Sequence, residues 1–156
     1  MTEVPPGFDR HTRHSGLTDP WEPIYARQTE DALILAVRAD APHCNARGFV
    51  HGGLISALAD NAMGLSCRQT MVRERGEESV SSLVTVTLVV DFLDMARAGQ
   101  WLAFETDFGR TGSTLCFAEC SVTADGAVCA RAQARFRVIK PHSSPSPAAN
   151  TSPKEA

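Results

Sequence analysis

A glycine-rich segment, residues 43–53, reads His-Cys-Asn-Ala-Arg-Gly-Phe-Val-His-Gly-Gly and leads directly into a predicted helix. Glycine costs about 1 kcal/mol relative to alanine inside a helix, so Gly52 and Gly53 at its start need an explanation. Without β-carbons, the first backbone amides of the helix can be approached closely by a ligand. They have no partner within the helix, and the helix dipole adds partial positive charge. The segment therefore predicts a site for a developing oxyanion, although a tight turn alone would also explain the glycines.

Asp60 is the second residue that could do chemistry. It lies in the middle of the predicted helix among apolar residues, where burial of an ionised carboxylate is costly. At about 100° per residue, one stripe of the helix holds Gly53, Ser56, Asp60 and Gly64. The stripe could face solvent or an interface. Alternatively, Asp60 lines a crevice, with a pKa raised by burial, and acts as a base or nucleophile. The surrounding apolar run favours the second interpretation.

The spacing of these candidates has a geometric consequence. Gly52 and Asp60 are eight residues apart, which is about 12 Å along one helix. An Asp side chain cannot reach a carbonyl held at the Gly52 amide of its own chain. If both residues act on one substrate, the carboxylate must come from a second subunit, which predicts an active site shared across a dimer interface.

The elements that must position these residues show two hydrophobic periods. Apolar residues at helical spacing predict a long buried helix from Gly53 to about Val72. Period-two alternation predicts strands over residues 24–28, 32–38, 84–92, 101–108, 115–122 and 128–139, with turns at Ala98-Gly99, Gly109–Gly112 and Asp125-Gly126. The pattern predicts an α+β domain, in which a curved antiparallel sheet of about six strands packs around the helix.

Within the run 84–92, strict alternation makes a specific prediction about side-chain direction. It places Leu88 and Phe92 on the same face as Val84 and Val86, and places Thr85 on the opposite face. A sheet packed on a single helix also leaves strand edges uncovered, so assembly through an edge is expected.

The folded domain is expected to span residues 20–140. Residues 1–19 are predicted to be irregular because of their prolines and glycines, and the Pro/Ser-rich stretch 141–156 is predicted to be a flexible tail. A chain of 156 residues has room for one such domain.

Composition excludes several classes of function. Fifteen Lys and Arg against 18 Asp and Glu give a net charge of −3, which argues against a nucleic-acid partner. No stretch is long and apolar enough to span a membrane or resembles a signal peptide, so a cytoplasmic location is expected. The five cysteines form no C-x-x-C pair, so neither a disulfide framework nor a zinc site is expected.

The motifs Asn45–Asp60 (N-A-R-G-F-V-H-G-G-L-I-S-A-L-A-D) and V-T-V-T-L-V-V-D-F-L, followed by G-R-T-G-S-T-L-C-F-A-E-C and A-R-A-Q-A-R-F-R-V, carry a family resemblance. Over roughly Pro20–Ile139 the chain resembles the hotdog-fold acyl-CoA thioesterases of the PaaI-like branch, related to phenylacetic acid degradation. This resemblance implies the hotdog fold, dimers with a continuous joint sheet, and tetramers built from two dimers. It also implies hydrolysis of acyl-CoA thioesters with no metal or other cofactor, coenzyme A being part of the substrate.

The resemblance also assigns roles to residues. Gly52 would polarise the thioester carbonyl through its amide, and Asp60 of the partner subunit would be the general base or nucleophile. Asn45 would place the substrate or water, and Thr85 would hydrogen-bond the water or the carboxylate. His51 and Gly53 would shape the substrate loop. The coenzyme A contacts do not carry over in this way. The turn that holds Arg110, Gly112 and Ser113, with Arg73 and Arg75 after the helix, offers cations and amides for the coenzyme A phosphates, although these could also be ordinary solvated loop residues.

Two alternatives to a thioesterase stay open at this point. One is a hotdog hydratase or dehydratase, which uses a histidine with a carboxylate and has local signatures not found around His51. The other is a module that binds acyl-CoA without catalysis. Release of free thiol distinguishes a thioesterase from both.

Overall fold

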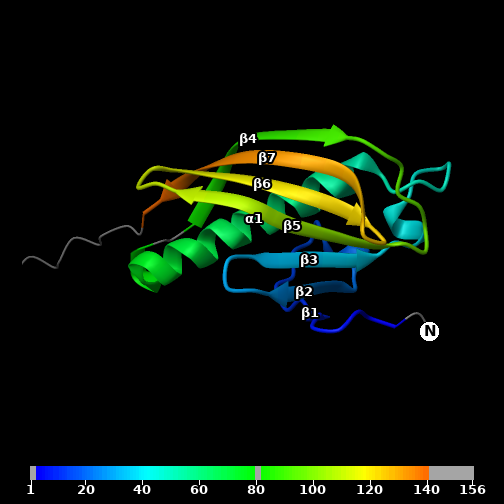
Figure 1. Cartoon of the computed structure of the whole chain (residues 1–156), viewed down its shortest axis with the longest axis horizontal. Helices are drawn as coiled ribbons and strands as arrows, with labels where there is room; N and C mark the ends of the chain where they lie inside the picture. The colour runs from blue at the N-terminus through cyan, green and yellow to red at the C-terminus, as the bar shows by residue number, and fades with distance from the viewer. Residues whose placement is uncertain (1–2, 80–81, 141–156) are drawn as a thin grey trace, which may run out of the picture.

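The computed structural model describes residues 3–79 and 82–140, in which one long helix, α1 (Gly52–Arg75), lies against a curved antiparallel sheet (Figure 1). The strands are β1 (Asp9–Arg10), β2 (Ile24–Gln28), β3 (Leu33–Arg38), β4 (Ser82–Phe92), β5 (Trp101–Thr111), β6 (Leu115–Ala124) and β7 (Ala127–Ile139). Their order in the sheet is β1-β2-β3-β5-β6-β7-β4, so β1 and β4 form the two edges. This arrangement confirms the predicted α+β class, with the sheet around the helix.

Helix α1 is longer than predicted, beginning at Gly52 and ending three residues beyond Val72. It ends where Gly76 takes a positive φ of 85° and donates its amide to the Val72 carbonyl at 2.8 Å. Arg73 and Arg75 in the last turn favour the extension, because cations interact well with the negative end of the helix dipole.

The core lies between α1 and the sheet. The helix buries its apolar face, including Leu58, Ala62 and Met63, each 0% exposed. Most helix-facing positions of β6 and β7 carry small side chains, among them Cys116, Ala118, Cys120, Ala130, Ala132 and Ala134, with Val122, Phe136 and Val138 as larger exceptions. Small residues let the helix approach these strands closely, which is how a thick helix fits inside the curve of the sheet.

Five strands differ from the prediction by one to three residues at one end, and one short strand was not predicted. Strand β5 continues through Gly109 to Thr111, so the connection to β6 is tighter than the predicted turn at 109–112. The two-residue β1 was not predicted; it pairs Asp9 with Ala26 and Arg10 with Tyr25. A strand of two residues has no detectable period, so alternation could not indicate it.

The predicted alternation of β4 is wrong for its first half. Pairing with β7 shifts register between Thr85 and Thr87, where the strand gains one residue as a β-bulge. Val84 and Val86 are 52% and 59% exposed, whereas Leu88 is partly buried against the core. The extra residue reverses the inward and outward alternation of the side chains that precede it. Thr85 therefore faces the helix, on the same side as Leu88.

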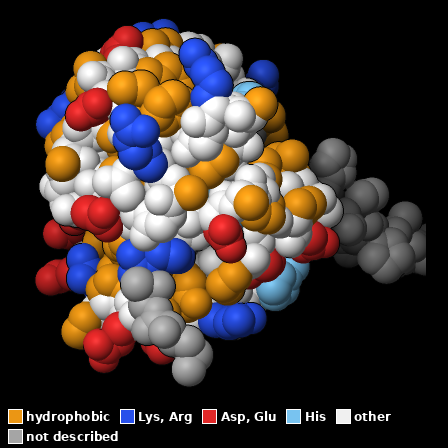
Figure 2. All heavy atoms as spheres, turned by 90° about the vertical axis from the view of Figure 1, so that its right-hand side faces the viewer, with side chains coloured by type: hydrophobic (Ala, Val, Ile, Leu, Met, Phe, Trp, Pro, Cys, Tyr) orange, Lys and Arg blue, Asp and Glu red, His pale blue; other side chains and the backbone are white. Residues whose placement is uncertain are grey.

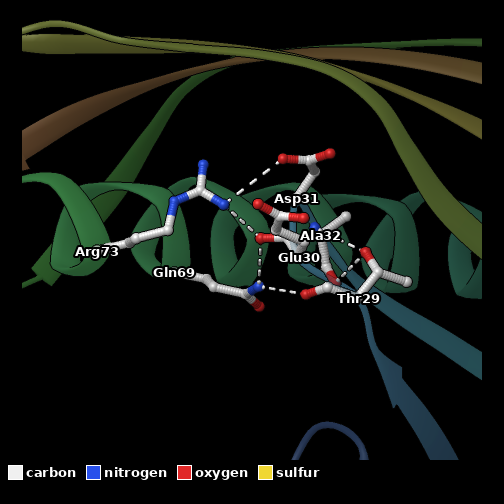
Figure 3. A network of polar contacts seen from close by, with 6 residues as sticks. All are labelled: Thr29, Glu30, Asp31, Ala32, Gln69 and Arg73. Carbon is white, nitrogen blue, oxygen red and sulfur yellow. Dashed lines mark hydrogen bonds and ion pairs between the residues drawn. The ribbon is translucent and has the colours of Figure 1, made fainter.

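The C-terminal half of α1 is tied to the turn between β2 and β3 (Figure 3). Gln69 Nε2 donates to the Thr29 carbonyl at 2.8 Å, and Arg73 donates to the Glu30 carbonyl and to Asp31 Oδ1, the latter at 3.5 Å. These contacts fix the helix relative to the sheet edge that carries the N-terminal strands.

The surface of the molecule mixes charged and hydrophobic side chains. At the end of the molecule where the loop before α1 lies, charged side chains of both signs are scattered among hydrophobic ones (Figure 2). Among the described residues, no helix is long and apolar enough to cross a membrane. The predicted tail, 141–156, lies outside the described residues.

Candidate functional site

The loop before α1 is organised by Asn45. Its side-chain Oδ1 accepts hydrogen bonds from the amides of Arg47 at 2.9 Å and Phe49 at 3.3 Å. The backbone closes the turn through Asn45 N to Phe49 O at 2.7 Å, and Gly48 takes a φ of 77°. The oxygen of the Asn45 side chain is thus engaged in shaping the loop, and its amide nitrogen remains as the group that could meet a ligand.

His43 anchors the same loop from inside the protein. It is 4% exposed, and both of its ring nitrogens are engaged. Nδ1 accepts from the Asp40 amide at 2.8 Å, so the neutral ring carries its proton on Nε2, which lies 2.9 Å from the Trp21 carbonyl. The His43 carbonyl then accepts from the His51 amide at 2.9 Å. His43 is therefore structural.

The start of α1 leaves one backbone amide free. His51 Nδ1 accepts from the amide of Gly53 at 2.9 Å, and the next two amides donate to the His51 carbonyl. The amide of Gly52 has no acceptor among the described residues. The predicted pair of glycine amides is thus reduced to a single available donor, Gly52, while His51 and Gly53 form the cap that orients it.

Phe92 explains why residue 52 has no side chain. A β-carbon added at Gly52 would lie 3.0 Å from Phe92 Cζ, at the end of β4. Any side chain at position 52 would have to displace the Phe92 ring, and glycine avoids this while leaving the amide uncovered.

Asp60 and Thr85 form the polar contact that the sequence resemblance suggested. Thr85 Oγ1 donates to Asp60 Oδ1 at 2.9 Å, joining α1 to β4. Burial raises the pKa of the Asp60 carboxyl above its ordinary value, and the hydrogen bond from Thr85 opposes this by lowering it. The bulge in β4 makes the contact, because strict alternation would have turned Thr85 away from the helix.

Asp60 lies in a pocket of about 270 Å³ that an unexpected segment helps to line. Its floor is apolar and includes Ile24, Leu35, Leu58 and Phe136. Another part of the lining comes from His11, Arg13 and His14, in the region predicted to be irregular. The close spacing of three basic residues was the available signal, but no sequence pattern placed them beside a helix residue some 50 positions away.

The structure does not bring all predicted site residues together within one protomer. Gly52 does not line the Asp60 pocket, and eight residues of α1 separate them, about 12 Å along the axis. Arg110 lies on the outer face of the sheet, paired across the strands with Phe117. Gly112 donates its amide to the Leu115 carbonyl at 2.8 Å, so this amide is occupied. Ser113 is exposed in the same turn.

Comparisons with known proteins show which proteins this chain resembles. The family model described as Thioesterase superfamily matches residues 47–130, a range that contains Gly52, Asp60 and Thr85 but not Asn45. A candidate esterase from Pseudomonas aeruginosa is 36% identical over 139 residues, covering 88% of this chain and 99% of that protein.

Two further proteins are more distant. Human acyl-coenzyme A thioesterase 13 is 29% identical over 91 residues, covering 58% of this chain and 60% of that protein. A mutant of the phenylacetic acid degradation protein PaaI from Thermus thermophilus superposes with a TM-score of 0.67 at 16% identity, covering 80% of this chain and 100% of that one. The structural likeness confirms the fold that the resemblance implied.

Proposed function

The chain belongs to the thioesterase superfamily, and on that premise we propose that it hydrolyses acyl-CoA thioesters to a free acid and coenzyme A. The observation that carries the proposal is the half-buried Asp60 carboxylate, held by Thr85 beside a pocket. The name of the human relative, an acyl-coenzyme A thioesterase, supports the substrate class.

The proposed chemistry begins at the free amide of Gly52. The thioester carbonyl oxygen accepts from this amide, so that negative charge developing in the tetrahedral intermediate meets a preorganised donor at the positive end of α1. The amide nitrogen of Asn45 lies on the same loop and would orient the substrate or the attacking water. His51 would keep the Gly52 amide in place through its cap on Gly53.

Asp60 supplies the reactive carboxylate. It takes a proton from water as the water attacks, or attacks the carbonyl itself to form a mixed anhydride that water cleaves. In either route the C–S bond breaks and the sulfur of coenzyme A leaves as a thiolate, which is a good leaving group because thiols have a pKa near 8.5. The chemistry needs no metal or other cofactor. The alternatives of hydration and of binding without catalysis predict no release of thiol.

The proposed site joins two subunits. Because Asp60 cannot reach a carbonyl at Gly52 of its own chain, the carboxylate acts on a substrate held by the partner's loop. Two-fold symmetry then gives two equivalent sites per dimer. The position of β4 at the edge of the sheet supports pairing of two such edges, because one row of its backbone amides and carbonyls faces outward. A tetramer of two dimers is the larger assembly implied by the family.

The test of the proposed function is Asp60→Asn, assayed by release of free thiol from a panel of acyl-CoAs of differing length and aromaticity. We expect kcat to fall by about 10²- to 10⁴-fold, the usual contribution of a positioned base. Asp31→Asn serves as the control, since it removes a surface carboxylate that is 88% exposed and outside the Asp60 pocket. Full activity of Asp60→Asn would overturn the assignment.

A further inference from the structure

The lining of the Asp60 pocket holds more basic than acidic side chains. We define the basic wall as His11, Arg13, His14 and Arg68, all of which line this pocket. Asp60 is the acidic residue in the same lining. Two guanidinium groups and two imidazoles therefore surround a pocket with a single carboxylate, and that carboxylate is already engaged by Thr85.

The N-terminal part of the basic wall is held in place at both ends. Before it, β1 pairs with β2, and the His11 amide donates to the Ile24 carbonyl at 2.9 Å. After it, Thr18 is 4% exposed, and its hydroxyl lies 2.9 Å from the Ser15 hydroxyl. The segment 11–18, which carries three members of the basic wall, is thus anchored at both ends although it has little regular structure.

The side chains of the wall differ in whether they already have an ionic partner. Arg68 pairs with Glu77 through one nitrogen, and His14 Nδ1 lies 3.4 Å from Glu22. The Arg13 side chain makes no hydrogen bond or ion pair within the described parts of the chain, and it is exposed. Arg13 is therefore the cation best placed to take up an anion from a ligand.

The pocket combines this wall with an apolar floor. Leu58 is 0% exposed, and Ile24, Leu35 and Phe136 beside it are also buried. The pocket has a volume of about 270 Å³, which suits an acyl group. Pockets for drug-sized ligands measure roughly 300 to 1,000 Å³, so this one has no room for a nucleotide in addition to the acyl group. Methylene groups fit the floor, and a negatively charged end group fits the wall.

We propose that this pocket selects acyl groups that end in a carboxylate, with Arg13 as the main specificity-determining residue and Arg68 as its second cation. The proposal rests on the proposed function, because it names the acyl class for the same site. The reacting carbonyl lies at Asp60, and Arg68 is eight residues further along α1, about 12 Å. A chain of about six carbons spans much of this distance, and the long side chain of Arg13, which makes no ion pair among the described residues, is available to meet its carboxylate end.

The test compares two thioesters that differ only in the end group, hexanoyl-CoA and adipoyl-CoA. We expect the wild type to have the higher kcat/KM for adipoyl-CoA. Arg13→Gln should lower that value about tenfold, the effect of losing one charge-assisted hydrogen bond, and leave hexanoyl-CoA within about twofold. Arg10→Gln is the matched control, because Arg10 precedes the wall and does not line the pocket. Arg68→Lys, which keeps the charge, should retain the preference better than Arg68→Gln.

Two further arms separate the possible outcomes. The same acyl pair on N-acetylcysteamine carries no phosphate, so the effect of Arg13→Gln on the adipoyl ester should persist there. If instead both CoA esters lose activity equally and the effect vanishes without phosphates, the wall binds coenzyme A and the proposal is wrong. No preference for the adipoyl group in any series also overturns it.

A calorimetric titration distinguishes failure of the basic wall from failure of the proposed hydrolysis. Asp60→Asn is titrated with adipoyl-CoA and with hexanoyl-CoA, in the presence and absence of Arg13→Gln. Tighter binding of adipoyl-CoA that depends on Arg13 supports the wall even if the protein hydrolyses no thioester. Equal binding of the two esters refutes the wall even if hydrolysis is fast.

Discussion

At the scale of single residues, Asp60 is subject to two opposing effects. Burial favours its protonated form, and the Thr85 hydroxyl favours its ionised form. Only the ionised carboxylate can accept a proton or attack a carbonyl. The activity of the proposed enzyme therefore depends on a balance that one hydroxyl group adjusts.

This balance predicts a pH dependence. In the wild type, kcat/KM should fall toward acid pH with an apparent pKa above 3.8, the ordinary value for this carboxyl group. Thr85→Val keeps the size and branching of the side chain but removes the hydrogen bond that lowers the pKa of Asp60. The acid limb should then move to higher pH, because desolvation is left unopposed.

The control for that experiment lies two residues along the same strand. Thr87 lines a pocket on the outer face of the sheet together with Val89 and Phe117. Thr87→Val makes the same chemical change away from Asp60 and should leave the acid limb in place. An unmoved limb in Thr85→Val, or an equal shift in both variants, would show that the hydroxyl does not tune the carboxylate.

Functional residues could be predicted from the sequence where their residue type is unusual for its position. Glycines at a helix start and a carboxylate in an apolar helix are each unusual, so Gly52 and Asp60 could be singled out. His11 and Arg13 could not, because ordinary surface residues look the same. Their meaning depends on which distant segment they contact, and that is decided by the pairing of β1 with β2.

At the scale of elements, long periods were predictable and local irregularities were not. The buried helix and the longer strands follow from apolar spacing that repeats over many residues. The bulge in β4 inserts one residue without any change in composition, so Val84 and Val86 were assigned to the wrong face. The error matters for function, since it would have separated Thr85 from Asp60.

The turn between β5 and β6 gives a prediction about stability. A β-carbon at Gly112 would lie 2.7 Å from the Leu115 carbonyl oxygen, a backbone atom that cannot simply rotate away. Arg75 also ties this turn to α1 by donating to the carbonyls of Gly112 and Thr111. Gly112→Ala should lower the free energy of unfolding by about 1 to 3 kcal/mol through overpacking.

Denaturant unfolding at one protein concentration measures this effect. Gly109→Ala is the matched control three residues earlier, where an added β-carbon meets nothing within 4 Å. It should change the free energy of unfolding by less than about 1 kcal/mol. Equal stability of the two variants would show that the turn relaxes freely and that Gly112 is not required by its geometry.

At the scale of the whole molecule, the proposed function requires more than one protomer to complete the site. The free amide of Gly52 and the carboxylate of Asp60 occupy different turns of one rigid helix, so no loop movement within the chain can bring them together. The edge strand β4 carries Thr85 near one end and Phe92, which packs on Gly52, at the other. Pairing of two β4 edges would bring both halves of the site to one interface.

Mixing two inactive variants tests this arrangement directly. Asp60→Asn and Gly52→Val should each be inactive as homodimers. A mixed dimer contains one site built from the intact Gly52 of one chain and the intact Asp60 of the other, and one site with both defects. After random exchange, half of the dimers are mixed and half of their sites are intact, so about a quarter of wild-type activity should return.

Native mass spectrometry of differently tagged chains confirms exchange. Gly52→Ala provides a milder variant, because its methyl group meets only the tip of the Phe92 ring at 3.0 Å. If the site were built within one chain, every site in the mixture would keep one defect. Confirmed mixing with no recovered activity would therefore refute the shared site.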